Sequence, residues 1–144
     1  MKTLILVDIQ NDFLPGGPLA VSLGDEVVPV ANRLMSQYDM VVATQDWHPA
    51  DHCSFASQHP GHKPGDIIDL NGVSQVLWPD HCVQTTRGAD FAPGLNMTGV
   101  QWICHKGTDP GIDSYSGFFD NGRLKQTGLS DYLRKRGVQE VHIM

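Results

Sequence analysis

Short apolar runs alternate with helical patterns along the first part of this chain. Residues 3–8 form a continuous apolar run that ends in Asp8, a pattern typical of a strand buried on both faces of a parallel sheet. Residues 25–38 have helical periodicity with Asp25 as the expected N-cap, and four apolar side chains share one face: Val27, Ala31, Leu34 and Met35. Residues 40–44 form a second buried run. This order predicts a right-handed βαβ unit with parallel strands.

The second part of the chain begins with a long stretch of weak periodicity. Residues 46–98 contain many Gly, Pro, His and Asp, and loops this long inside a compact domain are usually functional. A third strand is expected at residues 100–104 and a fourth at residues 138–144. Between them, residues 129–136 predict a short helix that ends at Gly137 and turns three side chains inward: Leu129, Tyr132 and Leu133. We therefore expect one α/β domain with a mainly parallel sheet.

Composition and charge exclude several classes of protein. The 144 residues carry a net charge of −6, and the basic residues are scattered apart from residues 134–136, so no nucleic-acid footprint is present. No window approaches the ~18 apolar residues of a membrane span. The first apolar run stops at Asp8, which is too early for a signal peptide, so a cytoplasmic location is expected. Three cysteines without a CxxC pair fit reduced thiols.

A carboxylate and an imidazole lie two residues apart at the end of the second predicted strand. In extended backbone, Asp46 and His48 turn their side chains to the same side, which invites a metal ion. A third ligand could come from His52 or, across the long loop, from His81. Such a set suits zinc, manganese or iron. The alternative is a hydrogen-bonded turn, because an Asp-x-His spacing is common by chance.

Other candidate residues follow the first and third strands. Asp8 could act as a general base or as a structural acid, and a haloacid-dehalogenase-type phosphatase is disfavoured because that class requires a second Asp where this chain has Gln10. Lys106 could reach Asp8 at the same edge of the sheet or lie on the solvated surface. Four aromatic side chains could line a pocket for a flat ring or pack in the core: Phe13, Trp78, Tyr115 and Phe118.

Four segments together resemble bacterial nicotinamidases of the isochorismatase-like cysteine hydrolase family. They are residues 8–13 (DIQNDF), 44–52 (TQDWHPADH), 78–83 (WPDHCV) and 105–120, which begin HKG and end DSYSGFFD. Asp8 and Lys106 are shared across the wider family, whereas the DWH and WPDHC segments narrow the resemblance to nicotinamidases. The resemblance covers the whole chain and implies a three-layer α/β/α fold with a mainly parallel sheet.

The resemblance also implies an activity and a role for each candidate. In that family a cysteine thiolate attacks nicotinamide, ammonia leaves, and water hydrolyses the thioester to nicotinic acid, a reaction of NAD salvage. Asp8 would carry the proton with Lys106 assisting, and a divalent metal, zinc before manganese or iron, would be bound by Asp46, His48 and His81. His52 is a fourth ligand in some relatives and a neighbour in others. Three aromatic residues would bind the substrate ring, of nicotinamide or of pyrazinamide: Phe13, Trp78 and Tyr115. The implied partners are small molecules, with no nucleic acid and no membrane, and a homo-oligomer is compatible with the family.

One departure from the family concerns the nucleophile. The family's catalytic cysteine follows the fourth strand, where this sequence ends at Met144, so residues 1–144 are expected to be a single domain incomplete at the C-terminus and without turnover by themselves. Cys53, Cys82 and Cys104 belong to other segments. Two alternatives remain: a non-catalytic remnant that binds a metal or ligand, and another amide hydrolase of the superfamily that acts on a carbamoyl or vinyl-ether substrate without a metal.

Overall fold

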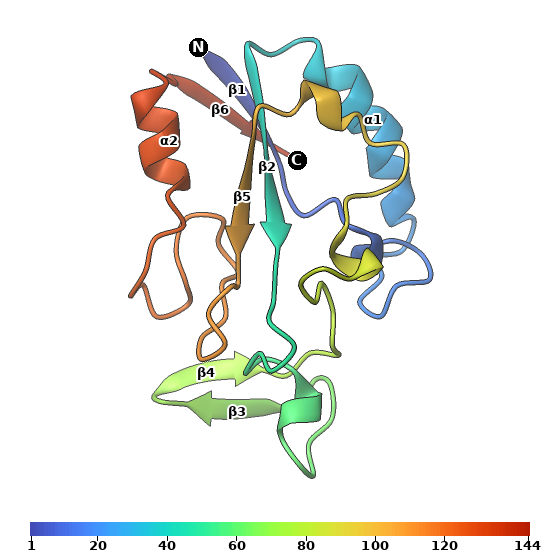
Figure 1. Ribbon diagram of the computed structural model, residues 1–144, viewed down its shortest axis with the longest axis vertical. Helices are drawn as coiled ribbons and strands as arrows, with labels where there is room; N and C mark the ends of the chain where they lie inside the picture. Colours follow the sequence, from blue (N-terminus) through green and yellow to red (C-terminus); the bar gives the residue numbers. More distant parts are fainter.

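A four-stranded parallel sheet forms the centre of the computed structural model, which describes residues 1–144 (Figure 1). The strands lie in the order β5-β2-β1-β6 and have these bounds: β1 Lys2–Leu6, β2 Met40–Asp46, β5 Trp102–Lys106 and β6 Glu140–Ile143. Every neighbouring pair is parallel, because each connection crosses back over the sheet before the next strand begins. The predicted parallel α/β fold is confirmed.

Two helices cover opposite faces of this sheet. Helix α1 (Val27–Met35) and helix α2 (Leu129–Lys135) lie on either side of the strands in Figure 1. Successive side chains of a strand point to opposite faces, so Leu4 and Leu6 of β1 pack in the cluster beneath α1, while Ile5 packs with α2. The two clusters make the three layers α/β/α that the family resemblance implies.

The helix ends differ in part from the prediction. Asp25 is not the N-cap of α1, because it lies inside a 3₁₀ turn (Gly24–Glu26) that leads directly into the helix, whose N-cap is Glu26. The stop of α2 at Gly137 is confirmed. Gly137 has φ +70°, its N–H donates to Arg134, and the next N–H reaches back to Leu133, which is the two-bond arrangement of a Schellman motif.

The long middle region contains a hairpin that the sequence analysis left without an element. Strands β3 (Ile67–Leu70) and β4 (Val73–Val76) pair antiparallel and lie beyond the carboxyl ends of β2 and β5 (Figure 1). Their turn is Asn71-Gly72, and both residues have positive φ, as a two-residue hairpin turn requires. The rest of the region is loop with short 3₁₀ turns at Ala56–Gln58, Arg87–Ala89 and, at its end, Met97–Gly99. A further 3₁₀ turn, Asn11–Phe13, follows β1.

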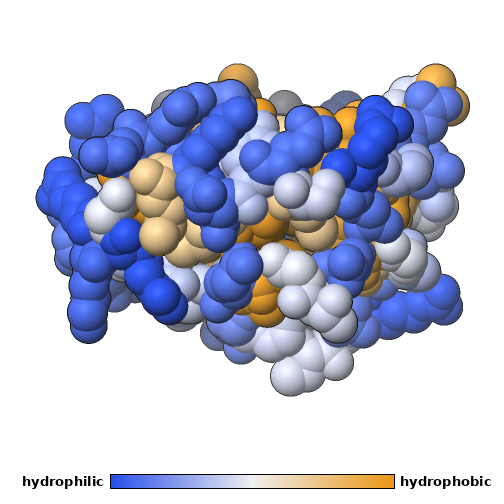
Figure 2. Space-filling model, turned by 90° about the horizontal axis from the view of Figure 1, so that it is seen from above, coloured by the Kyte–Doolittle hydropathy of each residue, from blue (hydrophilic) through white to orange (hydrophobic).

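The surface is mixed in character. Seen from above, polar side chains surround patches of apolar atoms (Figure 2). Part of the exposed apolar surface comes from the edge strand β6, all four of whose residues are exposed, with Ile143 at 63%. None of the helices has the length and the apolar character required to cross a membrane.

The sheet core should dominate stability. Leu4 is 1% exposed. Its replacement by alanine should lower the free energy of unfolding by about 2–5 kcal/mol, because the buried isopropyl group is removed and a cavity remains. Leu124 is 79% exposed, so Leu124→Ala should change the free energy of unfolding by less than about 0.5 kcal/mol. Urea unfolding of both variants checks this packing, and equal losses would contradict it.

Candidate metal centre and acid–base site

The carboxyl ends of three neighbouring strands bring together the charged residues of the site. Asp46 ends β2, Lys106 ends β5 directly opposite it, and Asp8 follows β1 by two residues. The Lys106 Nζ lies 3.0 Å from the Asp8 Oδ2 and also donates to the Asp46 Oδ1. Because all three side chains are largely buried, a single ammonium group bridges two carboxylates away from bulk water.

The shared ammonium group affects the two carboxylates differently. Burial raises the pKa of Asp46, but the neighbouring His48 and the charge of Lys106 outweigh it and bring the pKa to about 2. At Asp8, burial outweighs the opposing charge of Lys106, and the nearby Asp46 adds to it, so the pKa is raised. Burial lowers the pKa of Lys106, yet the two carboxylates raise it overall. Asp46 is therefore a fixed anion, whereas Asp8 is the carboxylate better suited to exchange a proton.

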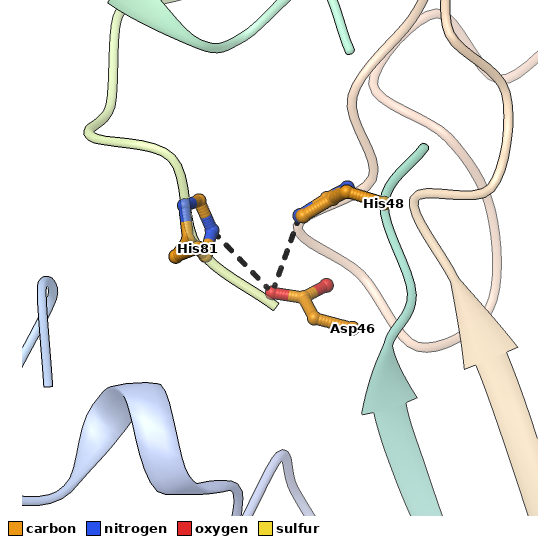
Figure 3. Close-up of side chains that lie close together, drawn as sticks. All are labelled: Asp46, His48 and His81. Carbon is orange, nitrogen blue, oxygen red and sulfur yellow. Dashed lines mark ion pairs between the residues drawn. The ribbon is translucent and has the colours of Figure 1, made fainter. Parts of the chain in front are cut away.

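Two imidazoles face the free oxygen of Asp46. Its Oδ2 lies 3.7 Å from the Nε2 of His48 and 3.9 Å from the Nε2 of His81, as Figure 3 shows. The Nδ1 of His48 donates to the Gly107 carbonyl at 2.8 Å, and the Nδ1 of His81 donates to the Pro79 carbonyl at 2.7 Å. Carbonyl oxygens can only accept, so each Nδ1 carries a hydrogen, and in the neutral ring each Nε2 has a lone pair that faces Asp46.

This donor set fits a divalent metal ion. Two imidazoles oriented by carbonyl groups and one carboxylate oxygen are ligands that zinc accepts, with further positions left for water or substrate. The three side chains are buried and their ligand atoms lie within 4.8 Å of one another. Burial lowers the pKa of His81, which favours the neutral form that binds a metal. At His48 burial also lowers the pKa, but the Asp46 carboxylate outweighs it and raises the pKa overall, so a metal ion would have to displace a proton there.

His52 lies beside His48, outside the group formed with Asp46 and His81. Its ring centroid is 4.2 Å from that of His48, and its Nδ1 is 2.8 Å from the Ser54 Oγ. Burial lowers the pKa of His52 to about 4. Its potential ligand atoms group with those of His48 and the buried Asp113 instead. Of the two candidates for the third ligand, the structure therefore brings His81, and not His52, against Asp46.

The predicted substrate-binding residues line the same cavity as these charged groups. A cavity of about 220 Å³ is bordered by Asp8, Asp46, His48, His81, Lys106, Phe13, Trp78 and Tyr115, together with Leu19, Asp113 and Ser114. The Trp78 Nε1 donates to the Tyr115 hydroxyl at 3.4 Å, which joins two walls of the cavity. Phe118 does not border it, because its ring packs against the core cluster beneath α2.

Two residues that the sequence patterns did not indicate, Gln10 and Ser114, also support the site. Gln10 is fully buried, and its side-chain amide accepts from the Asp46 N–H and donates to the Asp46 carbonyl, both at 2.8 Å. Gln10 thereby fixes both the backbone N–H and the backbone carbonyl of Asp46. Ser114 contributes its carbonyl oxygen to Lys106 at 3.2 Å. The available signal was the position of Gln10, between two acids at the end of a buried strand.

No cysteine of residues 1–144 borders the cavity. Cys104 lies in β5 and faces the core, Cys82 is fully buried beside His81, and Cys53 lies in the loop after His52. Burial raises the pKa of all three thiols, to about 11 for Cys53, which disfavours a reactive thiolate.

Comparison with known proteins defines the class. The model of the Isochorismatase domain family matches residues 2–144, so the chain belongs to the isochorismatase family. It is 50% identical over 147 residues to the nicotinamidase of Escherichia coli, and the match covers 99% of this chain and 68% of that protein. These findings make the chain an amidohydrolase of the nicotinamidase group.

Solved structures agree with this classification. An Acinetobacter nicotinamidase and pyrazinamidase superposes with a TM-score of 0.96 at 47% identity, covering 99% of this chain and 69% of that one. The pyrazinamidase of Pyrococcus horikoshii in complex with zinc superposes with a TM-score of 0.73 at 37% identity, covering 99% of this chain and 68% of that one. The chain spans about two thirds of the length of these relatives.

A glycine contact tests the metal centre without removing a ligand. Gly107 has φ +62°, and a Cβ there would lie 2.3 Å from the Cε1 of His48, so Gly107→Ala should displace the imidazole. We expect zinc affinity to fall about 10- to 100-fold, as for other losses of a group that orients a ligand. Gly128→Ala is the matched control, because Gly128 also has positive φ (+89°) but faces open space. Titration with zinc checks both variants, and equal dissociation constants would contradict the predicted contact.

Proposed function

We propose that this chain forms the metal-binding and acid–base parts of a nicotinamidase, which hydrolyses nicotinamide to nicotinic acid and ammonia in NAD salvage. One observation carries the proposal: a single cavity places the Asp8–Lys106 pair beside the group Asp46, His48 and His81. The 50% identity to the nicotinamidase of Escherichia coli supports the choice of substrate.

Asp46, His48 and His81 are the proposed ligands of a divalent ion, with zinc as the first candidate. The zinc complex of the Pyrococcus pyrazinamidase and the two Nε2 atoms that face the Asp46 carboxylate support this choice. These three residues would hold the ion, which would offer a coordination position to the pyridine nitrogen and so help to orient the substrate ring. His52, whose ring centroid is 4.2 Å from that of His48, is proposed to support the His48 imidazole.

The proposed substrate contacts come from three aromatic residues. Phe13 and Trp78 lie on the cavity wall and would bind the faces of the pyridine ring, with Tyr115 closing the opening. Tyr115 is 54% exposed and is held by donors from Trp78 and Gln75, so its ring is positioned at the rim. Pyrazinamide is proposed as a second substrate, since its ring is also flat and carries the same carboxamide.

Asp8 is proposed to move the proton of the reaction. It would take the proton from the attacking thiol, whose sulfur forms a thioester with the carboxamide carbon as the C–N bond breaks, and then give that proton to the departing ammonia. Water then hydrolyses the thioester. The raised pKa of Asp8 suits both transfers, and Lys106 would keep the carboxylate oriented. Because no cysteine of residues 1–144 borders the cavity, we propose that the thiol comes from a segment outside these residues.

Ammonia release from nicotinamide tests the proposed function in the natural, full-length protein. We expect the protein to release ammonia. Chelation of the metal should abolish this turnover and added zinc should restore it. Alkylation of the thiol should also abolish it. A polypeptide of residues 1–144 should bind zinc but release no ammonia. Turnover that survives chelation would instead indicate a metal-independent amide hydrolase of the same family, and absence of turnover with intact zinc binding would indicate a ligand-binding protein.

Removal of the Asp8 carboxylate separates acid–base chemistry from metal binding. In the full-length protein, Asp8→Asn should lower kcat by about 10²- to 10⁴-fold, because the amide cannot accept the thiol proton. Zinc affinity should stay within about twofold, since Asp8 lies outside the proposed ligand set. Asp131→Asn, at an exposed position of α2, is the matched control and should leave both quantities unchanged. Full activity of Asp8→Asn would exclude the assigned role.

A further inference from the structure

The residue that follows His81 has an unusual backbone conformation. Cys82 is fully buried and has φ +46°, in the left-handed region that glycine adopts freely and other residues rarely adopt. A side chain is accommodated there only when the surroundings hold the backbone. The proposed ligand His81 is therefore attached to a peptide segment that needs outside support.

The Asp12 carboxylate supplies that support. Its Oδ2 accepts the Cys82 N–H at 2.7 Å, across 70 positions of sequence. No basic side chain forms an ion pair with Asp12, so its carboxylate is available to the backbone. The surroundings leave room for this contact, because a Cβ at Gly88 would lie 2.1 Å from the same Oδ2.

The other side of Cys82 is joined to the second imidazole ligand. Its carbonyl oxygen accepts the His48 N–H at 3.0 Å, and the His48 carbonyl accepts the Gln84 N–H at 2.8 Å. These bonds form a short parallel bridge between the loops that carry His48 and His81. The conformation of Cys82 therefore sets how the two loops meet.

We infer that Asp12 is a positioning residue of the metal centre, which holds Cys82 in the left-handed conformation and thereby sets His81 against Asp46 and His48. Asp12 does not border the cavity, so it acts through the loop and not on the substrate. This inference rests on the proposed metal site. Asp12 lies near the start of the chain and is not one of the three proposed ligands, so the inference adds a supporting residue to the metal site.

Metal titration of the full-length protein tests the role of Asp12. Asp12→Ala should weaken zinc binding about 10- to 100-fold and alter the visible spectrum of bound Co²⁺, because His81 is no longer fixed. Asp12→Asn should retain affinity within a few-fold, since its side-chain carbonyl can still accept the Cys82 N–H. If the unaltered protein binds zinc and Asp12→Ala binds it with the same dissociation constant, the positioning role is overturned but the proposed metal site is not. Absence of zinc binding in the unaltered protein would overturn it together with the proposed metal site.

A second substitution distinguishes positioning from general stability. In the Asp12→Ala background, Cys82→Gly should recover at least several-fold of the lost zinc affinity, because glycine adopts positive φ without support. Cys82→Ala removes the same thiol but keeps a Cβ, so it is the matched control and should recover none. Equal dissociation constants for the two double variants would overturn the inference, whatever their thermal stability.

Discussion

The carboxylate of Asp46 has two oxygens, and each serves a different part of the site. One oxygen accepts from Lys106, which also contacts Asp8, and the other faces the Nε2 atoms of His48 and His81. This sharing is possible only because β1, β2 and β5 are neighbours in a parallel sheet and end at one edge. The acid–base pair and the proposed metal centre are therefore coupled through a single residue, and a displacement of Asp46 disturbs both.

Main-chain contacts keep that residue and its neighbours in place. Gln10 fixes the backbone of Asp46 through its N–H and its carbonyl, while the carbonyls of Pro79 and Gly107 select the tautomer of each imidazole. Backbone groups move less than side chains, so the ligand geometry is set before a metal or substrate arrives. The loops at the site are therefore held by hydrogen bonds, although they contain little regular structure.

The parallel α/β fold could be predicted from local patterns, whereas the choice among the candidate site residues was implied by the family resemblance. Buried parallel strands leave apolar runs that end in polar residues, and those ends identify the edge where Asp46 lies. The β3–β4 hairpin was missed because the signal Asn71-Gly72 lay in a stretch treated only as loop. The place of Phe118 stayed open between a pocket and the core, because aromatic residues serve both, and the structure places it against the core. The contact between Asp12 and Cys82 joins residues 70 positions apart, and no local pattern predicts such a bond.

The most direct measurement of the central claim is anomalous diffraction at the zinc absorption edge from crystals of the full-length protein grown with zinc and nicotinamide. The account predicts one strong peak at bonding distance from the Asp46 Oδ2 and from the Nε2 atoms of His48 and His81, with the pyridine ring beside it and Lys106 still bound to the other Asp46 oxygen. A fully loaded crystal with no peak between these three residues, or with zinc bound only elsewhere, would contradict it.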